Sequence, residues 1–309
     1  MKIATTLIGI EDVTAQETSG KIIAPGRIQF EKDIIPTTAN NIYTLIEHFM
    51  FKTIEDIETV ITKFTTTLKG TIRTECNRTG NHKFNSVDIE KTMNQHLRNK
   101  GYIIDFKQAE HIIYIDIIDN HCFIGIPIHL NLQKRPYRIK INNQGINACL
   151  AAAMIKLSGY TEGKTLADPF CKDGVILIEA ATQAKGNLYG IDTNKNNIRN
   201  AIINTKLAKK EVTYHNGDAS DLATLTPKKI DCIVSYPPFE SKMKKPGLMK
   251  RIYEQLFTQA QQHLQGTMII LSPDKKILEN STLPLKEERT IMIGKLTHYL
   301  FIWNTVQKD

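Results

Sequence analysis

The sequence lacks the features that mark several large classes of protein. It contains one tryptophan, 7% aromatic residues and five cysteines, and the cysteines are scattered singly rather than arranged in CxxC pairs. Such spacing predicts neither a disulfide framework nor a zinc cluster, and it is typical of a reducing compartment. No stretch approaches about eighteen uninterrupted apolar residues, and the N-terminal segment does not have the pattern of a signal peptide. We therefore expect a cytoplasmic protein.

The catalytic motifs of metalloenzymes, serine hydrolases and nucleoside triphosphatases are also missing. The histidines show no HExxH or HxxxH spacing, and the chain has neither a GxSxG elbow nor a GxxxxGK[ST] phosphate loop. The sequence thus predicts no metal site. It gives no support to hydrolase or nucleotide-hydrolysing functions.

What the sequence does contain is typical of a folded protein with a polyanionic partner. Apolar residues make up 41% and charged residues 23% of the chain, and mean hydropathy is −0.27. A length of 309 residues is about twice that of a typical domain and predicts two domains. The 40 basic residues exceed the 32 acidic ones and give a net charge of +8. This surplus favours a partner such as nucleic acid.

The two halves of the chain have different patterns. The first half mixes strand-like and helix-like segments and predicts an α+β fold. From about residue 146 onward, helices and strands alternate as in a parallel α/β sheet with right-handed crossovers. Residues 129–145, which contain Pro136 and the basic residues Lys134, Arg135, Arg138 and Lys140, are the expected linker. In the first half we expect strands at residues 2–8, 21–30, 70–75, 111–118 and 122–128, and helices at residues 43–51, 54–67 and 86–100.

Acidic residues follow three successive predicted strands of the second half. Asp168 ends the first strand, Asp192 ends the second, and Asp218 follows the third. Open α/β sheets bind ligands at the carboxyl ends of their strands, so these side chains are expected to lie at one site. Asp192 has the spacing of a carboxylate that accepts hydrogen bonds from ribose hydroxyls, and Asp218 suits an adenine amino group. Structural roles are the alternative, because Asp168 and Asp192 could cap helices and Asp218 could stabilise a turn.

In their order and spacing, the segments DPFCKDG, YGID, NGDA and SYPPF resemble the motifs of class I S-adenosylmethionine-dependent methyltransferases that act on an amino group. The resemblance implies that residues 146–309 form a Rossmann-like sheet of seven strands whose last strand is antiparallel. It implies S-adenosyl-L-methionine as cofactor and an exocyclic amine whose hydrogen bond is accepted by the carbonyl of Pro237. The implied cofactor-binding residues are Asp168, Pro169, Phe170, Cys171, Gly174, Asp192, Asp218 and Ala219. The implied catalytic residues are Tyr236, Pro237, Pro238 and Phe239, the last of which would stack on the base.

Two residues depart from these motifs. Lys172 stands where the family usually has glycine, and its ammonium could project over the pocket and lower the affinity for a sulfonium cation. Tyr236 stands where the family has Asp or Asn, and a phenol is a longer and weaker acceptor for an amine. These departures leave two interpretations open. The protein is either an enzyme with an altered acceptor, or an attenuated or inactive tRNA-binding paralogue or partner subunit.

The first half resembles modules of tRNA-modifying enzymes. The stretch GTIRTECNRTGNHKFNS, followed by a helix and two strand-like segments, resembles a THUMP domain, an RNA-binding module, over residues 51–128. Residues 1–50 resemble the ferredoxin-like domain that precedes it. Basic side chains supply affinity through phosphate contacts, although each one could also be an ordinary solvated charge. The predicted RNA-binding residues are Arg73, Arg78, His82, Lys83, Lys242, Lys244 and Lys245.

Together these resemblances imply a tRNA methyltransferase that modifies an exocyclic amine, with guanine N2 as the expected atom. The reaction would be an in-line displacement that depends on positioning more than on a strong base. A glutamine-directed protein methyltransferase has a similar PPF-type motif and is a further alternative, but it gives no reason for the THUMP-like half.

Overall fold

The structure is a computed structural model, and it describes residues 1–239, 248–281, 283–294 and 296–305. The chain divides into two compact units. The first comprises Met1–Thr6 and Thr14–Asn131, and the second comprises Leu7–Val13 and Leu132–Asp309. None of the helices in the described ranges is long and apolar enough to cross a membrane.

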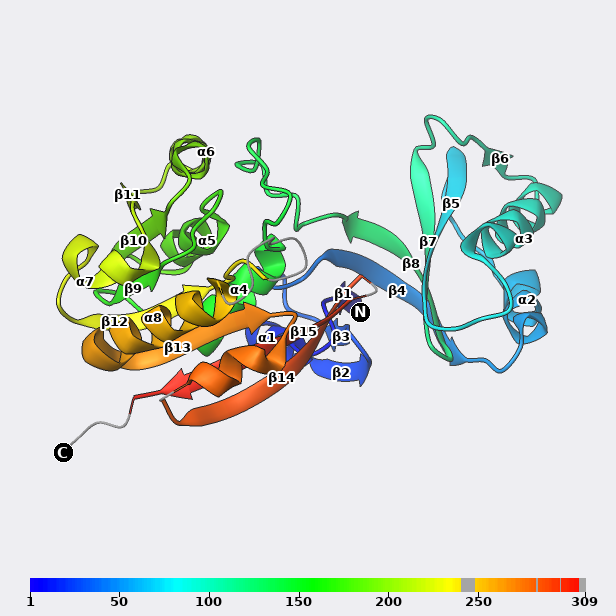
Figure 1. Cartoon of the computed structure of the whole chain (residues 1–309). Coiled ribbons are helices and arrows are strands. Elements are labelled where there is room, and N and C mark those ends of the chain that lie inside the picture. The colour runs from blue at the N-terminus through cyan, green and yellow to red at the C-terminus, as the bar shows by residue number, and fades with distance from the viewer. Residues whose placement is uncertain (240–247, 282, 295, 306–309) are drawn as a thin grey trace. The chain divides into compact units, whose positions relative to one another are not determined.

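The first unit is built on an eight-stranded mixed sheet with the order β2-β3-β1-β4-β8-β7-β5-β6 (Figure 1). Most neighbouring strands are antiparallel, and β5 is parallel to both β6 and β7. The helix α1 (Glu11–Thr18) crosses the division of the chain. The other elements of this unit are β1 (Lys2–Thr5), β2 (Lys21–Ala24), β3 (Arg27–Phe30), β4 (Asn41–Met50), α2 (Ile54–Lys63), β5 (Thr71–Thr79), α3 (Ser86–Asn99), β6 (Ile103–Ile104), β7 (His111–Ile118) and β8 (His121–His129).

The helices α2 and α3 pack against the sheet and form a hydrophobic core with it. Ile57 and Ile61 of α2 are fully buried in one cluster with Met93 of α3 and with Ile113, Ile115 and Ile117 of β7. The predicted helix at 86–100 is confirmed as α3, whose start is fixed by reciprocal bonds between Asn85 and Asp88. These contacts make α3 an amphipathic helix whose apolar stripe faces the sheet.

The prediction of a helix at residues 43–51 is wrong, because this segment is the strand β4. It pairs with β1 on one side and with β8 on the other, and its register with β8 shifts between Ile42 and Tyr43 and again between Leu45 and Glu47. Each such irregularity interrupts the two-residue alternation of a strand. The apolar residues are therefore spaced as in a helix, although long-range pairing makes the segment a strand.

The second unit is a seven-stranded sheet with the order β11-β10-β9-β12-β13-β15-β14. The strands β9 to β13 are parallel, and β15 is antiparallel to both of its neighbours. This confirms the predicted Rossmann-like sheet and its antiparallel last strand. The elements are α4 (Ala148–Leu157), β9 (Thr165–Asp168), α5 (Val175–Gln183), β10 (Asn187–Asp192), α6 (Lys195–Leu207), β11 (Thr213–Asn216), η1 (Ala219–Asp221), α7 (Leu222–Leu225), β12 (Ile230–Ser235), α8 (Leu248–His263), β13 (Leu264–Ser272), η3 (Lys275–Asn280), β14 (Leu285–Ile293) and β15 (Leu296–Asn304).

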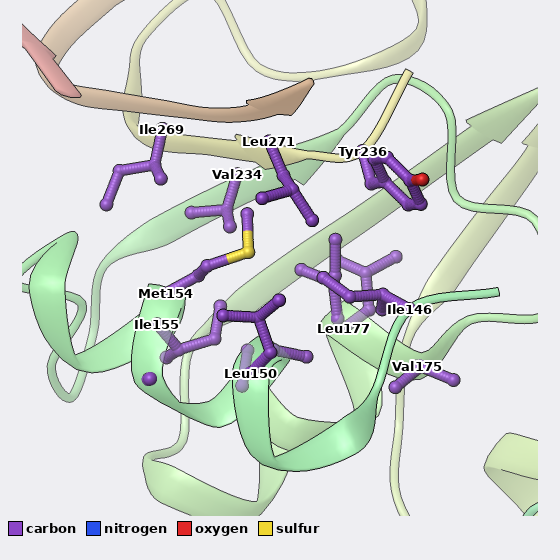
Figure 2. Close-up of a cluster of buried hydrophobic side chains, with 14 of the residues drawn as sticks. Ile146, Leu150, Met154, Ile155, Val175, Leu177, Val234, Tyr236, Ile269 and Leu271 are labelled. Atoms are coloured by element: carbon purple, nitrogen blue, oxygen red, sulfur yellow. The ribbon is translucent and has the colours of Figure 1, made fainter. Parts of the chain in front are cut away.

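Alternate residues of the central strands of this sheet are buried in two different clusters. On β12, Val234 lies in the cluster that contains residues of α4 and α5, whereas Ile233 lies in the cluster that contains residues of α8. On β13, Leu271 and Ile270 divide in the same way. Because successive side chains of a strand point to opposite faces, helices cover both faces of the sheet (Figure 1). Figure 2 shows the α4 and α5 side, where Val234 and Leu271 approach Met154.

The segment before α4, from Leu132 onward, belongs to the second unit and packs against its helices and turns. Arg135 donates two hydrogen bonds to Glu179 of α5, at 3.0 and 3.1 Å, and the hydroxyl of Tyr137 donates to the same carboxylate at 2.7 Å. Arg138 lies 3.6 Å from the carboxylate of Asp173. The basic residues Arg135 and Arg138 of this segment are therefore used to attach it to the sheet domain.

Candidate active site

A pocket of about 570 Å³ lies at the carboxyl ends of β9, β10, β11 and β12. Its size is within the range of small-molecule sites, and its position is the ligand-binding edge of an open α/β sheet. The residues that line it are Pro169, Phe170 and Lys172 after β9; Asp192, Thr193, Asn194 and Asn197 after β10; Asp218, Ala219 and Ser220 after β11; Pro238 after β12; Asn142 and Gln144 before α4; and Leu248, Arg251, Ile252 and Gln255 of α8.

The first turn is organised by Asp168, which is 1% exposed. Its Oδ1 accepts hydrogen bonds from the hydroxyl of Ser235 at 2.5 Å and from the backbone N–H of Phe170 at 3.1 Å. The N-cap of α5 is Gly174, with a φ of +83°, so Asp168 does not cap that helix. A Cβ at Gly174 would lie 2.5 Å from the hydroxyl of Tyr214, and this position therefore requires glycine.

Asp192 connects the turns that follow β9 and β10. Its carboxylate accepts from the backbone N–H of Lys172 at 3.1 Å, from the backbone N–H of Asn194 at 2.8 Å and from the side chain of Asn197 at 3.1 Å. The N-cap of α6 is Asn194 rather than Asp192. Asp192 thus faces the pocket as a carboxylate that is held in place by three donors.

Asp218 and Ala219 form the pocket wall after β11. The carboxylate of Asp218 accepts from the backbone N–H of Ser220 at 2.9 Å, and the backbone N–H of Asp218 donates to Asp221 at 3.1 Å. Asp218 therefore has the turn-stabilising role that the sequence allowed, and it lines the pocket as well. Ala219, which is 4% exposed, adds a small apolar surface beside it.

The residues that follow β12 divide between the pocket and the core. Pro238 lines the pocket, whereas Tyr236 and Phe239 pack with the α4 and α5 cluster. The Tyr236 hydroxyl and Nε2 of His298 are hydrogen-bonded at 3.1 Å. In Figure 2 this hydroxyl points away from the aliphatic side chains of Val234 and Leu271. Since Ser235 is bound to Asp168, neither hydroxyl of this motif is directed into the pocket as a free acceptor.

Lys172 is a lysine in the left-handed region, with a φ of +48°, and only 8% of its surface is exposed. Its Nζ donates to the carbonyl of Gln144 at 3.0 Å and lies 4.1 Å from the centroid of the Tyr236 ring. The residue therefore lies at the pocket wall with its charge against an aromatic face.

Burial shifts the pKa of two groups beside the pocket. It raises the pKa of Asp168 to about 7, against the lowering effect of the hydrogen bonds from Ser235 and Phe170. It lowers the pKa of Lys172 to about 8, although Asp168 and two other nearby carboxylates act in the opposite direction. Titratable groups with such shifts are concentrated at functional sites.

The pocket lining includes some of the predicted residues and several that the sequence did not reveal. Asp168, Cys171 and Gly174 lie behind the lining and shape the first turn. Residues of α8 were not predicted. Leu248, Ile252 and Gln255 follow one another at the spacing of a helix face, which is the signal that could have indicated them.

The predicted RNA contacts of the first unit differ in accessibility. Arg73 is paired with Glu75, and Nη1 of Arg78 is hydrogen-bonded to Nδ1 of His82 at 2.9 Å. Lys83 is exposed. Lys242, Lys244 and Lys245 lie outside the described residues. Within the described part of the chain, no group of three or more His, Cys, Asp or Glu residues is arranged to hold a metal ion.

Comparison with known families agrees with this architecture. Residues 135–295 match the RMKL-like methyltransferase domain, which is more than half of the chain. The chain belongs to the RMKL-like methyltransferase family. This confirms the predicted family and enzyme class, and with them the expected cofactor class, S-adenosylmethionine. Residues 38–127 match the THUMP domain, which confirms that prediction as well.

Individual relatives span both halves. The tRNA (guanine(6)-N2)-methyltransferase of Archaeoglobus fulgidus is 22% identical, over 97% of this chain and 91% of its own length. The human U6 snRNA (guanine-N(2))-methyltransferase is 27% identical, over 63% of this chain and 39% of its own length. The crystal structure of TrmN from Thermus thermophilus has a TM-score of 0.80 at 20% identity and covers 99% of both chains. This RMKL-like chain therefore shares its complete fold with that structure.

The residues of the pocket suit the cofactor of the family. Carboxylates of Asp192 and Asp218 can accept hydrogen bonds from hydroxyl and amino groups, and Ala219 with Phe170 offers apolar surface to a heterocyclic ring. The volume of about 570 Å³ accommodates a nucleoside with a short side chain. Among the described lining residues, Lys172 and Arg251 are the cations that oppose a positively charged ligand, and Lys172 is the buried one.

Proposed function

We propose that this protein transfers a methyl group from S-adenosyl-L-methionine to the exocyclic N2 amine of a guanine in tRNA. The observation that carries the proposal is the pocket, whose lining combines Pro169, Asp192, Asp218 and Pro238 from four successive strand ends. Guanine-N2 methyltransferases acting on RNA are among the relatives, and one of them matches over nearly the entire length of both chains. A tRNA substrate also favours the predicted cytoplasmic location.

In this proposal the cofactor supplies an activated methyl group. Asp192 would bind the ribose hydroxyls, Asp218 with Ala219 would bind the adenine, and the turn from Asp168 to Gly174 would shape the remainder of the site. Pro169, Phe170 and Cys171 belong to that turn. Asp192 suits its role because three donors fix the orientation of its carboxylate.

The acceptor amine would meet residues 236–239. The carbonyl of Pro237 makes no hydrogen bond within the described residues, and it would accept one from the exocyclic amine and orient the nitrogen. Pro238 would contact the substrate across the pocket wall. Phe239 lies outside the pocket lining and packs partly buried against the α4 and α5 cluster, so it would stack on the base with the face that remains accessible. Tyr236 would act through its position, since its hydroxyl is bound to His298 and its ring faces Lys172.

The first unit would dock the RNA. We propose residues 1–50 as a ferredoxin-like module, residues 51–128 as the THUMP module and residues 129–145 as the connection to the catalytic domain at 146–309. Lys83, which is exposed, would contact phosphate directly. Arg73, Arg78 and His82 would do so after exchanging protein partners for phosphate. Lys242, Lys244 and Lys245 would add contacts beside the catalytic motif.

One observation favours a second candidate, an RNA-binding protein that has lost methyl transfer. The acceptor usual in this motif is replaced by Tyr236, whose hydroxyl is bound to His298 within the protein. Such a paralogue would bind tRNA in a salt-dependent manner and leave it unmodified.

A methyl-transfer assay distinguishes these candidates. Purified protein is incubated with methyl-labelled S-adenosylmethionine and either a tRNA transcript or a U6-type RNA, and the nucleosides are identified by mass spectrometry. We expect labelled N2-methylguanosine from tRNA, and a loss of at least about a hundredfold in rate for Asp192→Ala, because that carboxylate orients the cofactor. Label in U6-type RNA but not in tRNA would mean that U6-type RNA, rather than tRNA, is the substrate. Binding of tRNA without any label would support the second candidate.

A further inference from the structure

The two positions at which the sequence departs from the family motifs contact each other. Lys172 follows β9 and Tyr236 follows β12, and these parallel strands are neighbours in the sheet, with Cys232 opposite Leu166. The ammonium nitrogen of Lys172 lies 4.1 Å from the centroid of the Tyr236 ring. The two departures therefore form one structural unit at the wall of the pocket.

The ammonium of Lys172 has little compensation for its burial. Its hydrogen-bond acceptor is the carbonyl of Gln144, at 3.0 Å, and no carboxylate among the described residues lies within ion-pair distance of it. Asp168 is bonded to Ser235 instead. A neutral carbonyl and an aromatic face stabilise a buried cation less than a carboxylate does.

The other charged groups around Lys172 are also engaged with different partners. Asp173 lies beside Arg138, and Asp192 is bonded to Asn197. Beyond the Tyr236 ring lies His298, whose pKa is lowered by burial. Arg251 of α8 lines the same pocket with an exposed side chain. Lys172 is thus a cation in the pocket wall, and no carboxylate of the described residues forms an ion pair with its ammonium.

We infer that Lys172 determines the charge specificity of this pocket, because its ammonium selects against a positively charged ligand and must lose its proton when the sulfonium cofactor binds. The inference rests on the proposed function, since it assumes that the pocket holds the adenosyl group. S-adenosylmethionine carries a sulfonium, whereas the product S-adenosylhomocysteine carries a neutral sulfide at the same atom. Two positive charges in a partly desolvated pocket repel each other more strongly than they do in water.

The pH dependence follows from the protonation of Lys172. Burial lowers its pKa to about 8, so near neutral pH most molecules carry the ammonium. If the sulfonium cofactor requires the neutral amine, its affinity rises roughly eightfold between about pH 7 and about pH 8.5, whereas the affinity for the sulfide does not follow this change. Ionisation of Asp168, whose pKa is raised to about 7, acts in the same direction and has to be separated by mutation.

Calorimetric titration with S-adenosylmethionine and with S-adenosylhomocysteine tests the inference. Lys172→Met removes the charge and keeps the length of the side chain, and Lys172→Arg keeps the charge at every accessible pH. We expect Lys172→Met to increase the ratio of sulfonium to sulfide affinity by about tenfold at pH 7 and to remove most of its change with pH, leaving only the smaller part that belongs to Asp168. For Lys172→Arg we expect a low ratio at all pH values.

Two further variants serve as controls. Arg251→Gln removes the same charge from an exposed side chain of the pocket, and it should change the ratio less than about twofold, because solvent screens that charge. Lys172→Gly suits the φ of +48° and replaces Lys172→Met if the latter does not fold.

An affinity ratio that is the same in wild type and Lys172→Met would overturn the inference. So would a pH dependence in Lys172→Met that is as large as in wild type, because all of it would then belong to Asp168 or another group. If neither ligand binds to wild type or to any Lys172 variant, the proposed function fails and the inference fails with it. These outcomes are distinct, because the first two require that both ligands bind.

Discussion

Arg27 in the first unit and Lys172 in the second are both cations with little exposed surface, 5% and 8% respectively. Arg27 forms a two-pronged ion pair with Asp116, and that carboxylate also accepts from Tyr43 and Asn77, each at 3.2 Å. Among the described residues, the ammonium of Lys172 contacts the Gln144 carbonyl and the Tyr236 ring, and it has no carboxylate partner.

The pKa values of the two cations move in opposite directions. Burial by itself lowers both, but Asp116 outweighs it and raises the pKa of Arg27, whereas the pKa of Lys172 falls to about 8. Arg27 is therefore a permanent structural charge in the first unit. Lys172 is a charge that the pocket can lose, and this difference separates a structural cation from one that responds to a ligand.

The largest expected effect is on the first unit. Asp116→Ala leaves the guanidinium of Arg27 buried without its carboxylate and should lower the free energy of unfolding by about 3–5 kcal/mol. Denaturant unfolding followed by circular dichroism measures this loss. Asp33→Asn is the control, since it breaks the exposed pair with Lys2 and should leave the midpoint unchanged. If Asp116→Ala changes the free energy of unfolding only slightly, Arg27 does not depend on its carboxylate, and the proposed difference between the two cations is wrong.

Lys172→Met should have the opposite effect and raise the free energy of unfolding. The folded-state pKa of Lys172 lies below that of an unfolded lysine, so the ammonium opposes folding below about pH 8, and this effect disappears as the pH rises toward about 10.5. The variant should therefore be more stable than wild type by up to about 3 kcal/mol at neutral pH and about equal to it at the alkaline end. Unfolding measured across this pH range gives the difference directly. Destabilisation at neutral pH would mean that the ammonium is structural, like that of Arg27.

The smallest expected effect separates backbone strain from charge burial. Lys172 and Lys209 both have left-handed φ values, +48° and +54°, but Lys209 is exposed. Replacement by glycine relieves the strain at either position and should stabilise the protein by no more than about 1 kcal/mol at Lys209. Lys172→Gly should exceed that value, because it also removes the buried charge. Equal effects in thermal unfolding would assign the gain to the backbone alone.

The sequence predicted the second unit better than the first. In the second unit, parallel strands end in polar turns, and motifs such as DPFCKDG and NGDA indicate both the strand and its carboxyl end. In the first unit, β4 was predicted to be a helix because its irregular register with β8 removes the alternation that identifies a strand. The local sequence pattern does not reveal a structure that depends on pairing between distant segments.

The same limit applies to the candidate site. The strand ends predicted Asp192 and Asp218, because their positions follow from the topology of the sheet. The contact between Lys172 and Tyr236 depends on side-chain directions in two turns, and the lining residues of α8 depend on how that helix packs on β12 and β13. Both arise from packing, which the sequence pattern does not determine.

Nucleoside analysis of tRNA from cells with and without this protein tests the proposed function most directly. Hydrolysed tRNA is analysed by mass spectrometry, and the amount of N2-methylguanosine is compared between the two strains. We predict that this nucleoside decreases in a subset of tRNAs when the protein is absent, and that the wild-type protein restores it while Asp192→Ala does not. Unchanged N2-methylguanosine in every tRNA, with both adenosyl ligands still binding to the purified protein, would contradict methyl transfer to tRNA guanine.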